Sequence, residues 1–360
     1  MADHEHWMRR CLQLARGGAN STAPNPMVGA VLVKSDHLLA EGWHKLAGGP
    51  HAEVECLRQL GETTIPNDAV MYVNLEPCSH HGRTPPCADL LIDRGVKSVV
   101  VAHNDPFPEV SGRGIARLRM AGIDVTEGVL RDEARWTNRR FLTSVEQGRP
   151  YIILKWARSA DGFLDQQPRN ERQVQRISGP DTNLLVHRWR SEEQAILVGS
   201  RTVINDDPQL TVRHVAGRSP LRVVIDRENK VPARSRVFDD AADSLLVTFK
   251  QREDVHVEQH VIDPSEDPID ALLRELHRRQ VRSLLVEGGG ELLHHFLERR
   301  LWDEARVITG SPVFRKGTPA PIIPTSVSRS VKMGNDLIEF HVRKGSAFDG
   351  GCATDLTVAW

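Results

Sequence analysis

The chain has 360 residues, a length that favours two domains over a single core. Its 39% hydrophobic and 26% charged residues are typical of a soluble globular protein. A formal net charge of -1 and only 5% aromatic residues disfavour a nucleic-acid or membrane surface, which needs basic or stacking side chains. No apolar stretch is long enough for a transmembrane helix and the first residues carry no signal core, so we expect a cytoplasmic protein.

Helix and strand patterns alternate along the first part of the chain. Apolar runs that predict buried strands occupy residues 27–33, 69–75 and 98–103, and helical patterns begin near Trp7, at His51 and at Cys87. A further helix is expected in GRGIARLRMAG and a further strand in IDVTEG. This alternation predicts an α/β layer structure. Gly148 and Pro150 then interrupt the pattern, and we place a domain boundary there, giving domains 1–146 and 147–360.

The second part is again α/β in pattern. Its expected strands carry the sequences YIILKWA, AILVG, LRVVID, SLLVT, SLLVEGG and EARVITG, with helices between several of them. Neither an internal repeat nor a low-complexity segment is present. Two α/β domains are therefore expected from the residues alone.

A set of metal-binding residue types recurs in the first part. His51 is followed by Glu53 in "HAE", and Cys78 and Cys87 bracket "EPCSHHGRTPPC". A catalytic zinc site uses three protein ligands of this kind and leaves one position for water, while a carboxylate beside it can move protons. The order H-x-E, P-C and a second Cys is the signature of zinc-dependent nucleobase deaminases. We therefore expect Zn²⁺ at His51, Cys78 and Cys87, with Glu53 as the proton shuttle.

These cysteines have three other interpretations. A disulfide between Cys78 and Cys87 is disfavoured, because a reducing compartment and an odd count of five cysteines argue against it. Two unrelated thiols would not explain the full motif. A closed structural zinc site is the strongest alternative, since His80 or His81 could supply a fourth ligand.

The spacing of the two cysteines departs from the common deaminase motif. Eight residues, SHHGRTPP, separate Cys78 from Cys87, where C-x-x-C is usual. The insertion carries His80, His81 and Arg83 towards the expected metal. These side chains suit a substrate with a phosphate or several carbonyl groups.

Longer stretches of the first part resemble a specific family. The segments TAPNPMVGAVLV, GWHKLAGGPHAEVECL, NLEPCSHHGRTPPCADLLI and NDPFPEVSGRGIARLRMAGIDV are similar to the deaminase half of the bifunctional riboflavin-biosynthesis deaminase/reductase family. The resemblance implies a cytidine-deaminase-like three-layer α/β/α domain with a mixed sheet. It implies hydrolytic deamination of 2,5-diamino-6-(5-phosphoribosylamino)pyrimidin-4-one. It also implies that the substrate is held by Asn25, His44, His80 and Arg83.

The second part resembles the reductase half of the same family. The resemblance implies a dihydrofolate-reductase-like fold and NADPH-dependent reduction of the product's ribosyl group to ribityl. The residues it places at catalysis are Lys155 and Asp206. Those it places at the substrate are Arg190, Leu210, Arg213 and Glu287. Those it places at NADPH are Ala157, Arg176, Thr202, Asp206, Arg227, Gly289, Gly290, Glu291, Leu292, Leu293, His294 and His295. The family commonly has leucine at Ala160 and tryptophan at Arg176, so this chain departs from it there.

The residues themselves support part of this assignment. Lys155 interrupts an apolar strand, where a lysine is costly to bury without a role. The strand, Gly288–Gly290 turn and following pattern in "SLLVEGGGELLHHFL" can hold a pyrophosphate at a helix start, although a simple tight turn is the plainer alternative. The turn does not fit G-x-G-x-x-G, which excludes a Rossmann motif. Arg190 and Arg213 can clamp a phosphate, or can be ordinary solvated charges.

The sequence therefore predicts a two-site enzyme that uses Zn²⁺ and NADPH on a small phosphoribosylaminopyrimidine. A deaminase with a second domain that binds without turnover remains an alternative. A nucleic-acid base deaminase is the alternative from another class, which the charge disfavours. We expect neither nucleic acid nor membrane as a partner, and from the resemblance we expect a homo-oligomer, a dimer or tetramer.

Overall fold

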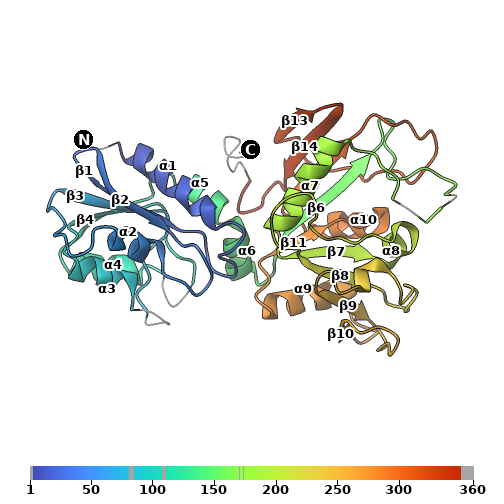
Figure 1. Cartoon of the computed structure of the whole chain (residues 1–360), viewed down its shortest axis with the longest axis horizontal. Helices are drawn as coiled ribbons and strands as arrows, with labels where there is room; N and C mark the ends of the chain where they lie inside the picture. Colours follow the sequence, from blue (N-terminus) through green and yellow to red (C-terminus); the bar gives the residue numbers. More distant parts are fainter. Residues whose placement is uncertain (1–2, 81–84, 108–110, 170, 173, 350–360) are drawn as a thin grey trace. The chain divides into compact units, whose positions relative to one another are not determined.

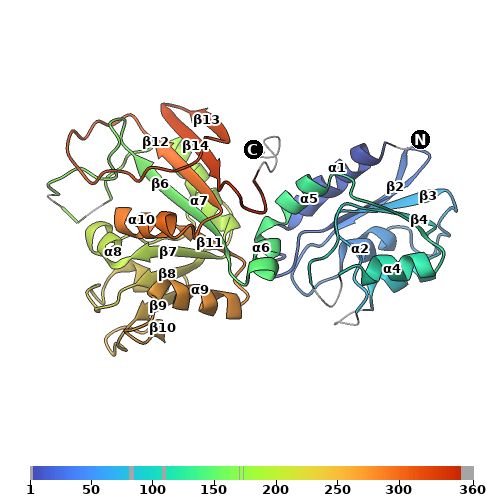
Figure 2. The ribbon, with the colours of Figure 1, turned by 180° about the vertical axis from the view of Figure 1, so that it is seen from behind.

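The computed structural model describes residues 3–80, 85–107, 111–169, 171–172 and 174–349. The chain divides into two compact units, Met1–Gln147 and Gly148–Val358 (Figures 1 and 2). Each unit is α/β, as the sequence pattern predicts. Within the described ranges, no helix has the length and apolar character needed to cross a bilayer.

The first unit is built on a mixed five-stranded sheet. Its elements are α1 (His4–Ala15), β1 (Gly29–Lys34), β2 (His37–Trp43), α2 (Ala52–Arg58), β3 (Ala69–Val73), α3 (Cys87–Asp93), β4 (Ser98–Val101), α4 (Arg113–Met120), β5 (Asp124–Glu127), α5 (Arg131–Thr137) and α6 (Arg139–Gln147). The strand order is β2-β1-β3-β4-β5. β1 is antiparallel to β2 and β3, whereas β3, β4 and β5 are parallel. The mixed sheet agrees with the predicted deaminase-like fold.

Helices cover both faces of this sheet because its strands are apolar on both sides. Leu32, Met71 and Val99 pack in one core with residues of α2, α3 and α4. The next residues along two of those strands, Val33 and Tyr72, face the opposite core with α1 and α5 (Figure 1). The result is the predicted three-layer α/β/α arrangement.

The second unit is built on a nine-stranded sheet. Its elements are β6 (Tyr151–Arg158), α7 (Pro180–Glu192), β7 (Ala195–Gly199), α8 (Ser200–Asp206), β8 (Leu221–Ile225), β9 (Ser244–Thr248), β10 (Glu258–Val261), α9 (Pro268–Arg278), β11 (Ser283–Val286), α10 (Gly290–Glu298), β12 (Glu304–Thr309), β13 (Arg329–Met333) and β14 (Asp336–Val342). A short 3-10 helix occurs in each unit, at Arg16–Gly18 in the first and at Arg236–Phe238 in the second. The strand order is β10-β9-β8-β7-β11-β6-β12-β14-β13.

Seven of these strands run parallel, and only the β12–β14 and β14–β13 pairs are antiparallel. The larger core joins the parallel strands to α9 and α10, and a smaller core joins α7 to β12 and β14. Figure 2 shows α7 and the α9–α10 pair on different sides of the strands. Because parallel strands end at the same edge, the segments that follow β6, β7, β8 and β11 converge there.

Candidate active sites

Three predicted metal ligands are brought together in the first unit. His51 is the N-cap residue of α2, Cys78 follows β3 in a loop, and Cys87 begins α3. One ligand atom from each residue lies within 4.8 Å of the others. The His51 Nδ1 atom is 3.6 Å from Cys78 Sγ and 3.3 Å from Cys87 Sγ. The four cysteines within the described ranges are free thiols, which excludes the disulfide between Cys78 and Cys87.

The spacing of these atoms fits a zinc ion. Ligands at about 2.3 Å for sulfur and about 2.1 Å for nitrogen, at tetrahedral angles, lie about 3.6–3.8 Å apart. Hydrogen bonding from Cys87 and His51 lowers the pKa of the Cys78 thiol to about 4, which favours the thiolate that binds metals. Of the two residues that could supply a fourth ligand, His80 is not part of this group and His81 lies outside the described residues. Among the described residues the donor set is thus two sulfurs and one imidazole, the composition of an open catalytic zinc site.

Glu53 lies in the first turn of α2 and is buried, with 3% of its surface exposed. Burial raises the pKa of its carboxyl, although the nearby His51 charge opposes this. A carboxyl group with a raised pKa holds a proton more readily than an exposed carboxyl group does. The side chain therefore has the properties that the expected proton shuttle requires.

Two of the predicted substrate residues extend this site. His44 is buried, and its ring lies edge-on to His51 with 5.6 Å between the centroids. Its Nδ1 lies 2.8 Å from the Pro50 carbonyl oxygen, which fixes Nδ1–H as the donor, and Nε2 then accepts from the amide of Asn25 at 3.2 Å. These contacts hold the His44 ring beside His51 and the Asn25 amide against His44. His80 is exposed, and Arg83 lies outside the described residues.

Glu76 and Asp105 organise the site's edge and were not predicted. The buried carboxylate of Glu76 accepts backbone N–H groups from Asp105, Gly112, Gly114 and Ile115 at 2.9–3.2 Å. Burial raises the pKa of Asp105 to about 6, and the negative charges of Glu76 and Cys78 also act to raise it. The signal that could have revealed Glu76 is its position directly before Pro77-Cys78, where a charged side chain follows a buried strand.

The second unit contains a large cavity of about 1240 Å³ at the ends of its parallel strands. Most predicted reductase residues line it, namely Lys155, Ala157, Arg176, Arg190, Thr202, Asp206, Leu210, Arg213, Arg227, Glu287, Gly289, Gly290, Glu291, Leu292 and His295. Two predicted residues do not line it: Leu293 is fully buried in the core, and His294 is exposed with its ring bonded to the Gly290 carbonyl. Consecutive helix residues point in different directions, so not all of residues 290–295 can face one cavity.

A largely buried ion triad lies in the cavity wall, with side chains that are 8–13% exposed. Glu287, which follows β11, receives two hydrogen bonds from Arg190 of α7 at 2.9 and 2.8 Å, and Lys155 of β6 approaches at 3.4 Å. Burial alone would raise the pKa of Glu287, but the charges of Arg190 and Lys155 outweigh it and lower the pKa to about 2. Burial also lowers the pKa of Lys155. The unusual lysine inside an apolar strand is thus explained by a charged partner and a cavity.

The glycine turn opens α10 towards the same cavity. Gly289 is the N-cap residue, and the first backbone N–H groups of the helix follow it. A side chain at Gly290 would meet Leu164 at 3.3 Å and Thr318 at 3.4 Å. Glycine avoids these contacts, and the first N–H groups of a helix, which have no partner within the helix, are of the kind that bind a pyrophosphate.

The far end of α8 is tied to a neighbouring loop. Asp206 accepts a hydrogen bond of 2.5 Å from Arg169, and Asp207 accepts one of 3.1 Å from Arg172. Thr202 lies near the glycine turn, with its hydroxyl 3.3 Å from where a side chain at Gly289 would begin. The negative charge of Asp206 is thus balanced by the Arg169 guanidinium.

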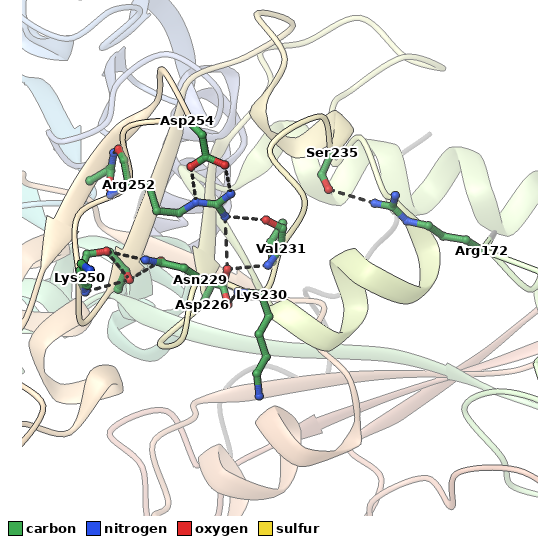
Figure 3. Close-up of polar contacts among 11 residues, drawn as sticks. Arg172, Asp226, Asn229, Lys230, Val231, Ser235, Lys250, Arg252 and Asp254 are labelled. Atoms are coloured by element: carbon green, nitrogen blue, oxygen red, sulfur yellow. Dashed lines mark hydrogen bonds and ion pairs between the residues drawn. The ribbon is translucent and has the colours of Figure 1, made fainter.

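A polar network fixes the loop after β8, which carries Arg227. Asp226 is buried and accepts the backbone N–H groups of Lys230 and Val231 at 2.9 and 2.8 Å. Arg252 reinforces it through the Val231 carbonyl at 2.6 Å (Figure 3). In Figure 3 the Lys230 side chain extends away from this network. Arg227 and Lys230 both line the cavity, so the network holds two cationic residues at its rim.

Two family profiles match this chain, one in each unit. Residues 1–103 match the cytidine and deoxycytidylate deaminase zinc-binding region, and residues 150–327 match the RibD C-terminal domain. A riboflavin biosynthesis protein RibD from Aquifex aeolicus is 38% identical over 354 residues, which cover 94% of this chain and 98% of that protein. The RibD of Escherichia coli is 39% identical over 318 residues, covering 83% and 85%.

Two solved structures are similar over both units. One is a diaminohydroxyphosphoribosylaminopyrimidine deaminase/5-amino-6-(5-phosphoribosylamino)uracil reductase from Thermotoga maritima, with a TM-score of 0.84, 35% identity and coverage of 94% and 97%. The other is RibD from Acinetobacter baumannii, with a TM-score of 0.84, 34% identity and coverage of 94% and 98%. With a paired deaminase and reductase architecture and relatives of this similarity along most of its length, the chain belongs to the RibD family of bifunctional riboflavin-biosynthesis enzymes.

Proposed function

We propose that the chain carries out two successive reactions on one phosphoribosylated pyrimidine. The first unit deaminates 2,5-diamino-6-(5-phosphoribosylamino)pyrimidin-4-one, and the second reduces the ribosyl group of the product to ribityl with NADPH. The observation that carries the proposal is the grouping of His51, Cys78 and Cys87 within 4.8 Å beside buried Glu53. The deaminase and reductase activities for which the Thermotoga maritima relative is named support the substrate class.

In the deaminase site, His51, Cys78 and Cys87 would hold Zn²⁺, whose chemistry there is to make water acidic enough to act as a nucleophile. Glu53 would accept one proton from the attacking water and pass it to the ring nitrogen as the new C–O bond forms. It would then accept the second proton, from the hydroxyl group now on the ring carbon, and pass it to the amino group, which leaves as ammonia when the C–N bond breaks. The ordered pair of Asn25 and His44 holds the pyrimidine against the site. His80 and Arg83 belong to the same proposal as substrate contacts.

In the reductase site, bound NADPH supplies the hydride. The reaction also requires one proton, and Lys155 is the proposed donor, because its burial lowers the ammonium pKa. Glu287 holds Lys155 in place and, with Arg190, Leu210 and Arg213, forms the wall that receives the substrate. We propose Asp206 as a second catalytic group, poised through its bond to Arg169.

The cofactor lies, in this proposal, along the strand ends from β6 to β8. Its pyrophosphate is placed at Gly289 and Gly290, where α10 offers free N–H groups. The adenosine end reaches Arg227 after β8, two strands from β11, or about 10 Å at the usual strand spacing. The remaining proposed contacts are Ala157, Arg176, Thr202, Glu291, Leu292 and His295.

The experiment measures both reactions with one preparation of the full chain. Ammonia release is followed on the diamino substrate without NADPH, and NADPH oxidation is followed on the deaminated product. Both signals are expected. Ammonia release without NADPH oxidation would indicate a deaminase whose second unit binds its ligand without turnover. The absence of both signals would refute the proposal.

We further propose a cytoplasmic homo-oligomer, as the family resemblance implies. Light scattering coupled to size-exclusion chromatography should give a dimer or tetramer mass. A monomer mass at assay concentration would refute the oligomer, and recovery of the protein in a membrane fraction would refute its location.

A further inference from the structure

His187 lies in the reductase cavity without any role assigned by the sequence motifs. It belongs to α7, one helical turn before Arg190, and both residues line the cavity. Only 1% of its surface is exposed. Its Nδ1 atom accepts a hydrogen bond of 3.2 Å from the backbone N–H of Arg213. A buried side chain of α7 thus fastens the segment that carries a proposed phosphate-binding arginine.

The surroundings of His187 keep its ring neutral, which this hydrogen bond requires. Burial lowers its pKa, and the charges of Arg190 and Arg213 lower it further, to about 4. The ring of His214 lies edge-on to it, with 4.4 Å between the centroids and an interplanar angle of 83°. His187 therefore has two contacts with consecutive residues, 213 and 214, of one cavity-lining segment.

The segment itself has few regular backbone contacts to hold it. It lies between α8 and β8 and contains no helix or strand. Leu210 adopts a φ of 57°, in the left-handed region that β-carbon-bearing residues disfavour. Val212 donates to the Ser219 hydroxyl at 3.1 Å, and Arg213 donates to the Thr211 hydroxyl at 2.7 Å. Side chains from outside the segment hold it: Arg190 donates to the Thr211 carbonyl at 3.5 Å and Arg222 to the Gln209 carbonyl at 3.4 Å, whereas His187 holds the backbone of Arg213 itself.

Arg213 is also well suited to receive an anion. Among the described residues, its guanidinium pairs with no carboxylate, whereas Arg190 and Lys155 share Glu287. This wall of the cavity carries three cations, Lys155, Arg190 and Arg213, and one carboxylate, Glu287, so it has an excess of two positive charges. A phosphate dianion would balance them.

We propose that His187 is a positioning residue of the reductase site, which acts through Arg213 to present that guanidinium to the phosphate of the substrate. The inference rests on the proposed reduction of a phosphoribosyl compound. It goes beyond it by naming a residue that determines preference for the phosphorylated substrate without touching the reacting atoms.

The test compares two substitutions in the full chain. His187→Leu keeps bulk and removes the acceptor, whereas His187→Asn retains an oxygen near the position of Nδ1. The exposed His256, which does not line the cavity, gives the matched control His256→Leu. KM and kcat are measured with the deaminated substrate, with the same compound after phosphatase treatment, and with NADPH varied.

His187→Leu should raise KM for the phosphorylated substrate about tenfold, the usual effect of one lost hydrogen bond, with kcat changed less than about threefold. The KM for NADPH and for the dephosphorylated compound should not change, and His187→Asn should recover most of the loss. In an Arg213→Ala background, His187→Leu should have no further effect, because the path through Arg213 is already gone. Equal losses for both substrates, an additive double variant, or no recovery with His187→Asn would overturn the proposal.

Binding of ribose 5-phosphate, measured by calorimetry, keeps the two claims distinguishable. If the wild-type chain oxidises no NADPH, the proposed function fails, but weaker ribose 5-phosphate binding by His187→Leu would still support the positioning role. Equal binding by both chains would overturn it. If His187→Leu does not fold, comparing His187→Asn with His187→Gln, whose oxygen lies further from the ring position of Nδ1, replaces it. Only the asparagine variant should then bind like wild type, and equal binding by the two would overturn the proposal.

Discussion

Substitution of Glu287 by glutamine should destabilise the second unit by about 3 kcal/mol at pH 7. The carboxylate is buried with two cations, and they lower its pKa from 4.5 to about 2. At about 1.4 kcal/mol per pKa unit, that difference is worth about 3 kcal/mol once the group is ionised in both states. Glutamine keeps the shape and removes the charge, so Arg190 and Lys155 are left uncompensated.

The effect should depend on pH with a definite sign. Because the folded-state pKa is lowered, the contribution is complete above about pH 4.5 and is lost as the pH falls towards 2. At pH 3 less than half of this contribution should remain. The difference between wild type and Glu287→Gln should therefore shrink on acidification, as the wild-type carboxylate itself becomes protonated.

Urea unfolding, followed by hydrogen exchange in peptides from β6 and β11, would report on this unit within the full chain. Glu291→Gln is the matched control, since the Glu291 side chain is 72% exposed and its ion pair within the described residues is with exposed Arg201 at 3.1 Å. It should change the unfolding free energy by less than about 1 kcal/mol. The reasoning is refuted if Glu287→Gln costs no more than this control, or if its cost grows as the pH falls.

Three further substitutions address the proposed sites. Glu53→Gln should abolish ammonia release and leave zinc content and NADPH oxidation unchanged, while exposed Glu62→Gln should alter none of them; retained ammonia release would remove Glu53 as the proton shuttle. Arg227→Ala should weaken NADP⁺ binding about tenfold and NAD⁺ binding little, because only NADP⁺ carries a 2′-phosphate on its adenosine for the arginine to contact. Calorimetry measures both affinities, with Arg234→Ala as the control, and an equal loss for both cofactors would argue against that contact. Glu76→Gln should lower deaminase activity and spare the reductase, because one amide oxygen cannot replace a carboxylate that accepts four N–H groups; unchanged ammonia release would exclude a role in ordering that loop.

The buried strands were predictable from sequence because each is a short, nearly unbroken apolar run. The strands that escaped prediction were β2, β10, β13 and β14. β2, β10 and β13 lie at sheet edges and carry exposed residues, and β13 alternates in exposure. β14 lies next to an edge, and its buried positions are interrupted at Leu337 and Glu339. Local hydrophobicity cannot distinguish such strands from loops.

The candidate sites divide in the same way. His51, Glu53, Cys78 and Cys87 carry a spacing and a chemistry that can be recognised along the chain. Glu76 contacts residues 29–39 positions away, and His187 contacts residue 213, 26 positions away. Such contacts depend on how the strands and loops converge, which no local pattern encodes.

The central claim is most directly tested by zinc analysis of the wild-type chain and of Cys87→Ala, with both activities measured on each. We predict one zinc per wild-type chain. We predict a variant without zinc or ammonia release that still oxidises NADPH when given the deaminated product. Zinc retained by Cys87→Ala, or ammonia release from a zinc-free chain, would contradict the account.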